Sequence, residues 1–220
     1  YFGTLIDVQL ENAELRRHQL GAGERLLRFD HLEQENAHLR ALLEMSRRVE
    51  TRTIAADILY NAPAPFARKV ILDRGAQQGV EPGLAVVDAN GVIGQITRVH
   101  PVQSEVTLLT DRNQSIPVSV VRNGVRGVLY GVGRGMLEMR HVLADVDIRV
   151  GDQLVTSGLD GVFVPGLPVA TVTSVNRDTD AFARIECEPL AAIERSVQVL
   201  VVGRAAYPPP PPPADEQGGR

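Results

Sequence analysis

The chain has 220 residues, 44% of them hydrophobic and 23% charged, with a formal net charge of −4, a composition that predicts a folded protein and gives little support for binding nucleic acid. A single cysteine, Cys187, excludes an intrachain disulfide framework and a cysteine-based zinc site. No apolar run approaches the ~20 residues of a transmembrane helix, so a membrane anchor, if the protein has one, is expected before Tyr1.

Residues 1–52 are predicted to form a coiled-coil helix. The segment from Leu5 to Glu50 lacks proline and is rich in good helix formers. Its apolar residues recur every three or four positions, with one extra three-residue step that resembles a stammer. The predicted dimer interface consists of the residues along this seam, which are Val8, Asn12, Leu15, Leu26, Phe29, Leu32, Asn36, Leu39 and Leu43.

A short motif repeats along the seam: the sequence ENAELR begins at Glu11, and ENAHLR begins at Glu35. Each copy places an asparagine, Asn12 or Asn36, on the apolar stripe. A buried asparagine there lowers stability but favours a parallel two-stranded pairing in one register. The alternative is that the helix packs on its own β region, although the seam is longer than so small a core can cover.

Residues 54–203 predict many short strands, because β-branched residues become frequent and turn residues recur every eight to twelve positions. Asn90-Gly91, Asn123-Gly124 and Asp160-Gly161 suit hairpin turns. The twelve expected strands are Ile54–Tyr60, Ala67–Asp73, Leu84–Asp88, Val92–Val99, Glu105–Leu109, Ile116–Val121, Val125–Tyr130, Met136–His141, Gln153–Thr156, Val169–Asn176, Ala183–Glu188 and Val197–Val202.

Twelve short strands predict a mainly β fold with two small barrel-like modules of about six strands each. A short internal sequence repeat supports two units, because Pro82-Gly83-Leu84 recurs as Pro165-Gly166-Leu167. We place the first module at residues 53–122 and the second at 123–203. The last strand, within residues 197–203, is almost wholly apolar, predicts burial on both faces, and is a candidate to close the first module.

Residues 204–220 are predicted to be a disordered tail. The tail contains the six-proline run Pro208–Pro213 and has no apolar cluster on which to fold. Alternatively, this run is a ligand for a groove that binds proline-rich segments.

Two successive β-barrels are also the architecture of a chymotrypsin-like hydrolase, which suggests one catalytic hypothesis. His100, Asp111 and Ser157 occur in the order of its triad. However, Ser157 lacks the Gly-Asp-Ser-Gly context, and His100 precedes a proline. We therefore predict no catalytic residue. We also predict no metal site and no cofactor.

Four arginines, Arg122, Arg126, Arg134 and Arg140, cluster around a predicted hairpin. They form either an ordinary charged strand face or a patch for an acidic partner. The low aromatic content of 4% and the lack of tryptophan argue against a glycan-binding platform.

Several stretches of the β region, together with the repeated coil motif, resemble the family of the rod shape-determining protein MreC. The matching stretches are Gly75–Val87, Gly91–Ile96, Ser104–Asp111, Gly151–Phe163 and Pro165–Val169. The resemblance covers about residues 5–203 and departs from the family pattern at Ala170, where a glycine is usual.

The resemblance implies a structural scaffold with no catalytic residues. Such proteins are held in the bacterial inner membrane by one N-terminal helix and expose the coil and the β modules to the periplasm. They form dimers or filaments and bind a penicillin-binding transpeptidase, RodA, MreD and the MreB system. Partners are expected to dock on exposed strand edges and grooves. A membrane-fusion-type adaptor is the remaining alternative, but in adaptors a helical hairpin interrupts the β modules.

Overall fold

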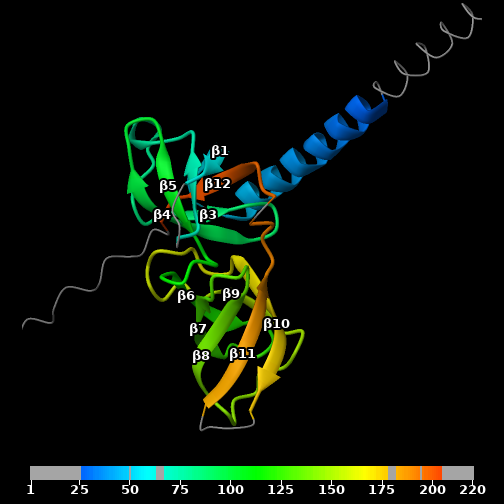
Figure 1. The fold of residues 1–220 in the computed structure, drawn as a ribbon, viewed down its shortest axis with the longest axis vertical. Coiled ribbons are helices and arrows are strands. Elements are labelled where there is room, and N and C mark those ends of the chain that lie inside the picture. Colours follow the sequence, from blue (N-terminus) through cyan, green and yellow to red (C-terminus); the bar gives the residue numbers. More distant parts are fainter. Residues whose placement is uncertain (1–25, 50, 63–66, 178–181, 194, 205–220) are drawn as a thin grey trace, which may run out of the picture. The chain divides into compact units, whose positions relative to one another are not determined.

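The computed structural model describes residues 26–49, 51–62, 67–177, 182–193 and 195–204 (Figure 1). The chain divides into two units, residues 1–44 and residues 45–220. The predicted helix before residue 26, with Val8, Asn12 and Leu15, lies outside the described residues, as does the proline-rich tail from residue 205.

A single helix covers residues 26–48 and crosses from the first unit into the second. Its last turn belongs to the second unit, where Met45 and Val49 are buried. The hydroxyl groups of Ser46 and Thr53 lie 2.7 Å apart and share a hydrogen bond, which ties the end of the helix to the start of the first strand.

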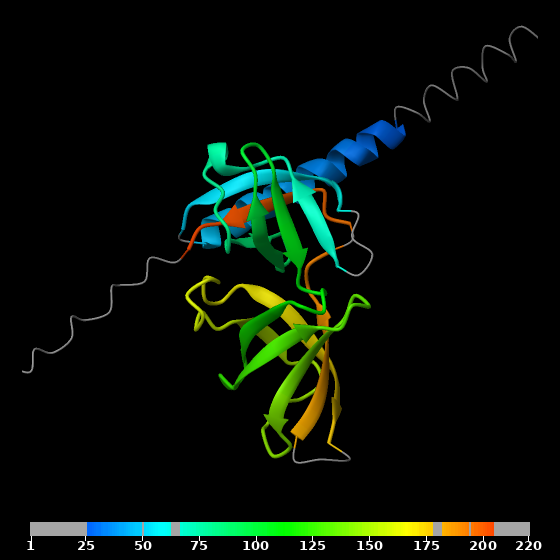
Figure 2. The ribbon, with the colours of Figure 1, turned by 60° about the vertical axis from the view of Figure 1, so that its left-hand side comes forward.

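The first barrel is closed by six antiparallel strands (Figures 1 and 2). Around the barrel they are β1 (Thr53–Asn61), β12 (Gln198–Val202), β3 (Ala85–Val87), β4 (Val92–Val99), β5 (Ser104–Leu108) and β2 (Lys69–Leu72). Strand β12 pairs with β1 on one side and β3 on the other, so the last described strand completes the barrel that the first described strand begins. A short 3₁₀ helix, η1 (Ala76–Gln78), follows β2.

The second barrel is also closed by six antiparallel strands. They are β10 (Pro168–Asn176), β11 (Phe182–Pro189), β8 (Leu137–Leu143), β7 (Arg126–Gly131), β6 (Ser115–Val120) and β9 (Gln153–Thr156). The predicted module boundary at residue 122 is therefore wrong, because β6 pairs with β7 and β9 of the second barrel. The Asn123-Gly124 turn joins β6 to β7 within one hairpin, and the chain passes between the barrels earlier, at residues 109–114.

The predicted fold class is confirmed, since all twelve expected strands form and six belong to each barrel. Strand β11 shows the period-2 alternation of a strand with one face in a core, with Ala183, Ile185 and Cys187 buried and their neighbours exposed. Strand β12 instead has four consecutive buried residues, Val199–Val202, as its apolar sequence predicts.

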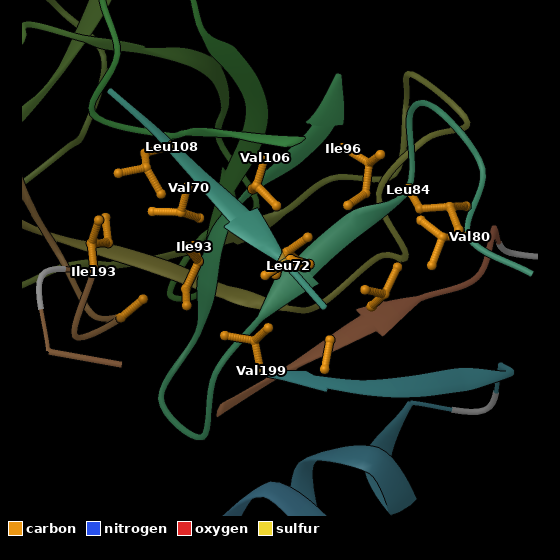
Figure 3. Packing of buried hydrophobic residues seen from close by; sticks show 14 residues of the cluster. Val70, Leu72, Val80, Leu84, Ile93, Ile96, Val106, Leu108, Ile193 and Val199 are labelled. Carbon is orange, nitrogen blue, oxygen red and sulfur yellow. The ribbon is translucent and has the colours of Figure 1, made fainter. Parts of the chain in front are cut away.

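Branched aliphatic side chains fill the first barrel (Figure 3). Leu72, Ile93 and Val106 are fully buried there, and they come from β2, β4 and β5. Glycine is required at position 94 of β4, because an added Cβ would lie 2.2 Å from the carbonyl oxygen of Thr107 in the neighbouring strand β5. The volume of the buried side chains and the close approach of adjacent strands together therefore determine which residues fit in this barrel.

Both copies of the Pro-Gly repeat form a turn directly before a strand. Gly83, just before β3, has φ 89°, and Gly166, just before β10, has φ 85°. A type II turn favours proline followed by a residue with positive φ, which glycine adopts without strain. The sequence repeat therefore reflects the same requirement at both turns, a proline followed by a glycine with positive φ.

Two segments connect the barrels, residues 109–114 and residues 190–197, and a buried aspartate holds each of them. Asp111 accepts hydrogen bonds from the backbone amides of Arg68 at 2.6 Å and Asn113 at 2.8 Å. Asp88 accepts bonds from the Ala192 amide at 2.8 Å and the Ser196 hydroxyl at 2.9 Å. These bonds attach both connecting segments to residues of the first barrel.

Candidate interaction surfaces

The described part of the predicted seam is open to solvent along the helix of residues 26–48. Leu26, Leu32 and Leu43 expose 66%, 53% and 54% of their surface, and Phe29, Asn36 and Leu39 are exposed as well. An apolar stripe of this length is expected to be covered by another surface in a stable assembly. Leu27, which lies off the predicted seam, is exposed too.

The barrels themselves offer few strand edges for a partner. Each of the twelve strands pairs with a neighbour on both sides, because both barrels are closed. Closure removes the unpaired backbone groups to which an extra strand could bind. The expectation that partners dock on exposed edges is therefore corrected: the outer faces of the strands and the loops remain.

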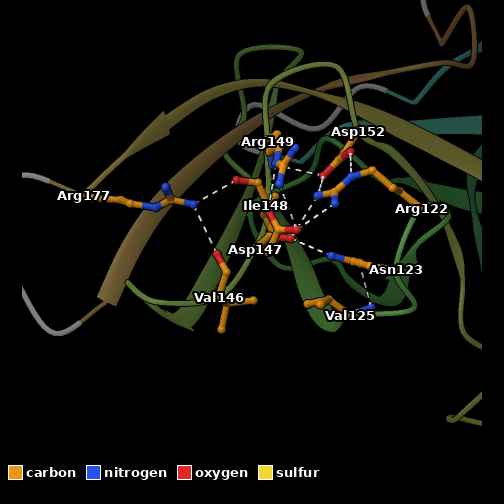
Figure 4. A network of polar contacts seen from close by, with 9 residues as sticks. All are labelled: Arg122, Asn123, Val125, Val146, Asp147, Ile148, Arg149, Asp152 and Arg177. Carbon is orange, nitrogen blue, oxygen red and sulfur yellow. Dashed lines mark hydrogen bonds and ion pairs between the residues drawn. The ribbon is translucent and has the colours of Figure 1, made fainter.

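A polar network joins two loops of the second barrel through Arg122 (Figure 4). The Arg122 guanidinium donates to both carboxylate oxygens of Asp152, at 2.8 and 2.9 Å, and to Asp147 at 2.7 Å. Asn123 donates to the Asp147 carbonyl oxygen at 2.6 Å, and Arg149 donates to the Asp147 carboxylate at 2.8 Å. The network holds the β8–β9 loop against the β6–β7 turn.

The charges in this network stabilise one another. Hydrogen bonds from Arg122, and next from Arg149, lower the pKa of Asp147 from 3.8 to about 2. Arg122 also lowers the pKa of Asp152, against the opposing effect of burial, and its own pKa is raised by the two carboxylates. The network lies mostly at the surface, so we expect salt to weaken it.

The four arginines on and around β7 and β8 do not form one patch. Arg122 is paired with Asp147 and Asp152. Arg140 pairs with Glu138 and lies over the ring of Tyr130, with its guanidinium carbon 5.1 Å from the ring centroid. Only Arg126 and Arg134 of the four have no ion-pair partner among the described residues.

His100, Asp111 and Ser157 do not form a triad. His100 is exposed in the turn after β4, whereas Asp111 is buried and bonded to backbone amides. Ser157 follows β9, and its hydroxyl accepts a long bond of 3.4 Å from the Leu159 amide. Throughout the described ranges no hydrogen bond joins any two of these three side chains, so the geometry gives the hydrolase hypothesis no support.

The remaining candidates for chemistry are sparse. The described residues contain no group of three His, Cys, Asp or Glu side chains able to hold a metal ion. Cys187 is buried in the second barrel, and burial raises the pKa of its thiol to about 12. In the described ranges no helix is both long enough and apolar enough to cross a membrane.

The adaptor alternative is also not supported. In the described residues between β1 and β12, the only helical segment is the three-residue η1. No helical hairpin interrupts the strands in these ranges.

Comparisons with known proteins agree with this architecture. A family model described as "Rod shape-determining protein MreC, barrel core" matches residues 58–203. The cell shape-determining protein MreC of Haemophilus influenzae is 41% identical over 197 residues, covering 89% of this chain and 56% of that protein. Its counterpart in Escherichia coli K12 is 37% identical, with 89% and 54% covered, so the chain spans about half the length of these curated relatives.

Solved structures show the same two-barrel fold. The crystal structure of MreC from Pseudomonas aeruginosa is 41% identical, with a TM-score of 0.67, and 69% of this chain and 99% of that chain are covered. A complex between penicillin-binding protein PBP2 and MreC from Helicobacter pylori matches with a TM-score of 0.57 at 20% identity, covering 70% of this chain and 99% of that chain. At that identity the second match shows the fold alone.

Proposed function

Because the chain belongs to the family of the rod shape-determining protein MreC, we propose that it is a non-catalytic scaffold that maintains rod shape by organising lateral cell-wall synthesis. One observation carries the proposal: the family's barrel-core model matches residues 58–203, which contain nearly all of both barrels. The relatives are named as cell shape-determining proteins. The family resemblance further implies a location at the periplasmic face of the inner membrane, with the protein held there by an anchor.

The scaffold acts by self-association along the helix. Its seam would pair with a second copy through Leu26, Phe29, Leu32, Leu39 and Leu43, and through Val8, Asn12 and Leu15 further toward the N-terminus. Asn36 would pair with its counterpart and fix the register. The exposure of the described seam residues supports this pairing. A dimer, or a filament built from dimers, would bring two sets of bound partners together and raise their effective concentration.

The partners are wall-synthesis proteins, first among them a penicillin-binding transpeptidase. The Helicobacter pylori relative has been solved in complex with PBP2, which supports a contact of this kind for the same fold. RodA, MreD and the MreB system complete the proposed set, on the family resemblance. Since both barrels are closed, their outer faces and loops would make these contacts.

Light scattering on the 220-residue chain tests the self-association. The unchanged chain should have the mass of a dimer or more. The double variant Leu32→Asp and Leu39→Asp should shift toward the monomer. Pairing of the helices would bury the new carboxylates without an opposite charge, which is unfavourable. Leu27→Asp is the matched control, since Leu27 exposes 73% of its surface and lies off the predicted seam. Equal masses for the double variant and the unchanged chain would contradict pairing through the seam.

Crosslinking in a rod-shaped bacterium tests the partners. A photoreactive residue would replace Leu159 or Phe182, two exposed apolar residues of the second barrel, in the membrane-anchored parent protein. Mass spectrometry should identify a penicillin-binding transpeptidase among the crosslinked proteins. Recovery of no wall-synthesis protein from either position, or the same proteins from the exposed Asp145 position, would count against this contact.

A further inference from the structure

A cleft opens in the unit of residues 45–220 where the two segments connecting the barrels come together. Its volume is about 400 Å³, within the range of ligand-binding pockets. Arg68 precedes β2, Thr110 belongs to the first connecting segment, Arg134 lies between β7 and β8, and Arg195 belongs to the second connecting segment. Residues of both barrels and of both connections therefore line one cleft.

The cleft is positively charged in a chain that is acidic as a whole. Among the described residues of its lining are three arginines, Arg68, Arg134 and Arg195, and one carboxylate, Glu188, whereas the chain carries a formal net charge of −4. Arg134 and Arg195 are exposed, and neither forms an ion pair with any described residue. Guanidinium groups bind carboxylates through two parallel hydrogen bonds, so these two side chains are available for an acidic ligand.

The lining is not purely ionic. Met136 is half-buried and Ile193 is buried, and both provide apolar surface beside the arginines. The wall also contains Thr110, whose buried hydroxyl has no hydrogen-bond partner in the described part of the chain. Buried hydroxyl groups normally have a partner, and an acceptor group entering the cleft would supply one.

We propose that this cleft docks an acidic segment of a partner protein, with its carboxylates on Arg134 and Arg195 and an apolar side chain on Met136 and Ile193. The mixture of basic and apolar lining fits a peptide with both kinds of side chain better than a compact anion, which has no apolar part to place on Met136 and Ile193. The inference rests on the proposed function only in taking the chain to be a binding protein. It adds the chemistry of one partner contact.

The test uses the 220-residue chain and a fluorescein-labelled nonapeptide of alternating leucine and glutamate, followed by fluorescence anisotropy. The chain should bind this probe, and a probe with glutamine in place of glutamate should bind at least about tenfold more weakly, since each charge-assisted bond contributes roughly a tenfold factor. The double variant Arg134→Ala and Arg195→Ala should weaken binding by at least about tenfold. Arg126→Ala is the matched control, an exposed arginine on β7 outside the cleft, and should bind as the unchanged chain does.

The proposal would be overturned by no binding to the unchanged chain, equal binding of the two probes, an unchanged affinity in the double variant, an equal loss in the control, or either of the two results that follow. Displacement of the probe by an equal concentration of inorganic phosphate would show an anion site only. Tighter binding after Asp215→Asn and Glu216→Gln would identify the chain's own C-terminal segment as the occupant. The double variant should keep the light-scattering mass of the unchanged chain, so this proposal and the self-association can fail separately.

Discussion

The Ser196 hydroxyl donates a hydrogen bond of 2.9 Å to Oδ2 of Asp88, a residue 108 positions earlier in the chain. The same oxygen accepts from the Ala192 amide, and Oδ1 accepts from the amides of Asn90 and Gly91 at 2.8 and 2.9 Å. One carboxylate therefore closes its own turn and also fixes the segment that returns the chain to the first barrel. Gly91 adds to this junction: a Cβ there would lie 2.6 Å from the Pro168 carbonyl oxygen in the second barrel.

Asp88→Ala should lower the free energy of unfolding by about 2–4 kcal/mol, because it leaves several donors at a buried site without an acceptor. Urea unfolding followed by circular dichroism would measure the loss. Asp145→Ala, at an exposed position of the β8–β9 loop, should change stability by less than about 0.5 kcal/mol. Similar effects of the two substitutions would mean that Asp88 does not stabilise the connecting segment.

Stability should fall in acid partly through the Arg122 network. The pKa of Asp147 is lowered from 3.8 to about 2, and that of Asp152 is lowered as well. Carboxyl groups with a lowered folded-state pKa stabilise the fold above the unfolded-state pKa, and this contribution disappears as the pH falls from about 4 toward 2. Arg122→Leu should therefore flatten the dependence of unfolding free energy on pH in that interval, measured by urea titrations at several pH values.

The control for this prediction is Arg126→Leu, which removes an arginine outside the network and should keep the original slope. At pH 7, high salt should reduce the difference in stability between the unchanged chain and Arg122→Leu, since the network is largely exposed to solvent. A slope between pH 4 and 2 that Arg122→Leu leaves intact would disprove the role of the network.

Leu72→Ala should cost about 2–5 kcal/mol of stability, because it leaves a cavity at the fully buried centre of the first barrel. Leu59→Ala, on neighbouring β1 but 46% exposed, should cost less than about 1 kcal/mol. Differential scanning calorimetry of both variants would decide. A small loss for Leu72→Ala would show that the barrel interior adapts to the missing volume.

Asn36→Leu tests the register of the seam. An asparagine in a paired seam costs stability, so leucine should raise the melting temperature of the helix but broaden the distribution of oligomers. Circular dichroism and analytical ultracentrifugation would follow the two effects. If neither stability nor stoichiometry changes, Asn36 does not face a paired helix.

The positions of the strands could be predicted because their signals are local. Period-2 alternation, as in Phe182–Pro189, and Pro-Gly turns before β3 and β10 depend only on neighbouring residues. The apolar seam of the helix is a local pattern for the same reason, and its exposure in the structure is compatible with that prediction.

The sequence by itself thus determined the fold class, the twelve strands and the helical stripe, since each arises from the spacing of side chains along a short segment. Tertiary structure alone decided which strands pair. It placed β6 in the second barrel, joined Arg122 to Asp147 and Asp152, and brought Arg134 and Arg195 to one cleft. Those relationships depend on barrel closure between residues far apart in the chain, and no local period encodes them.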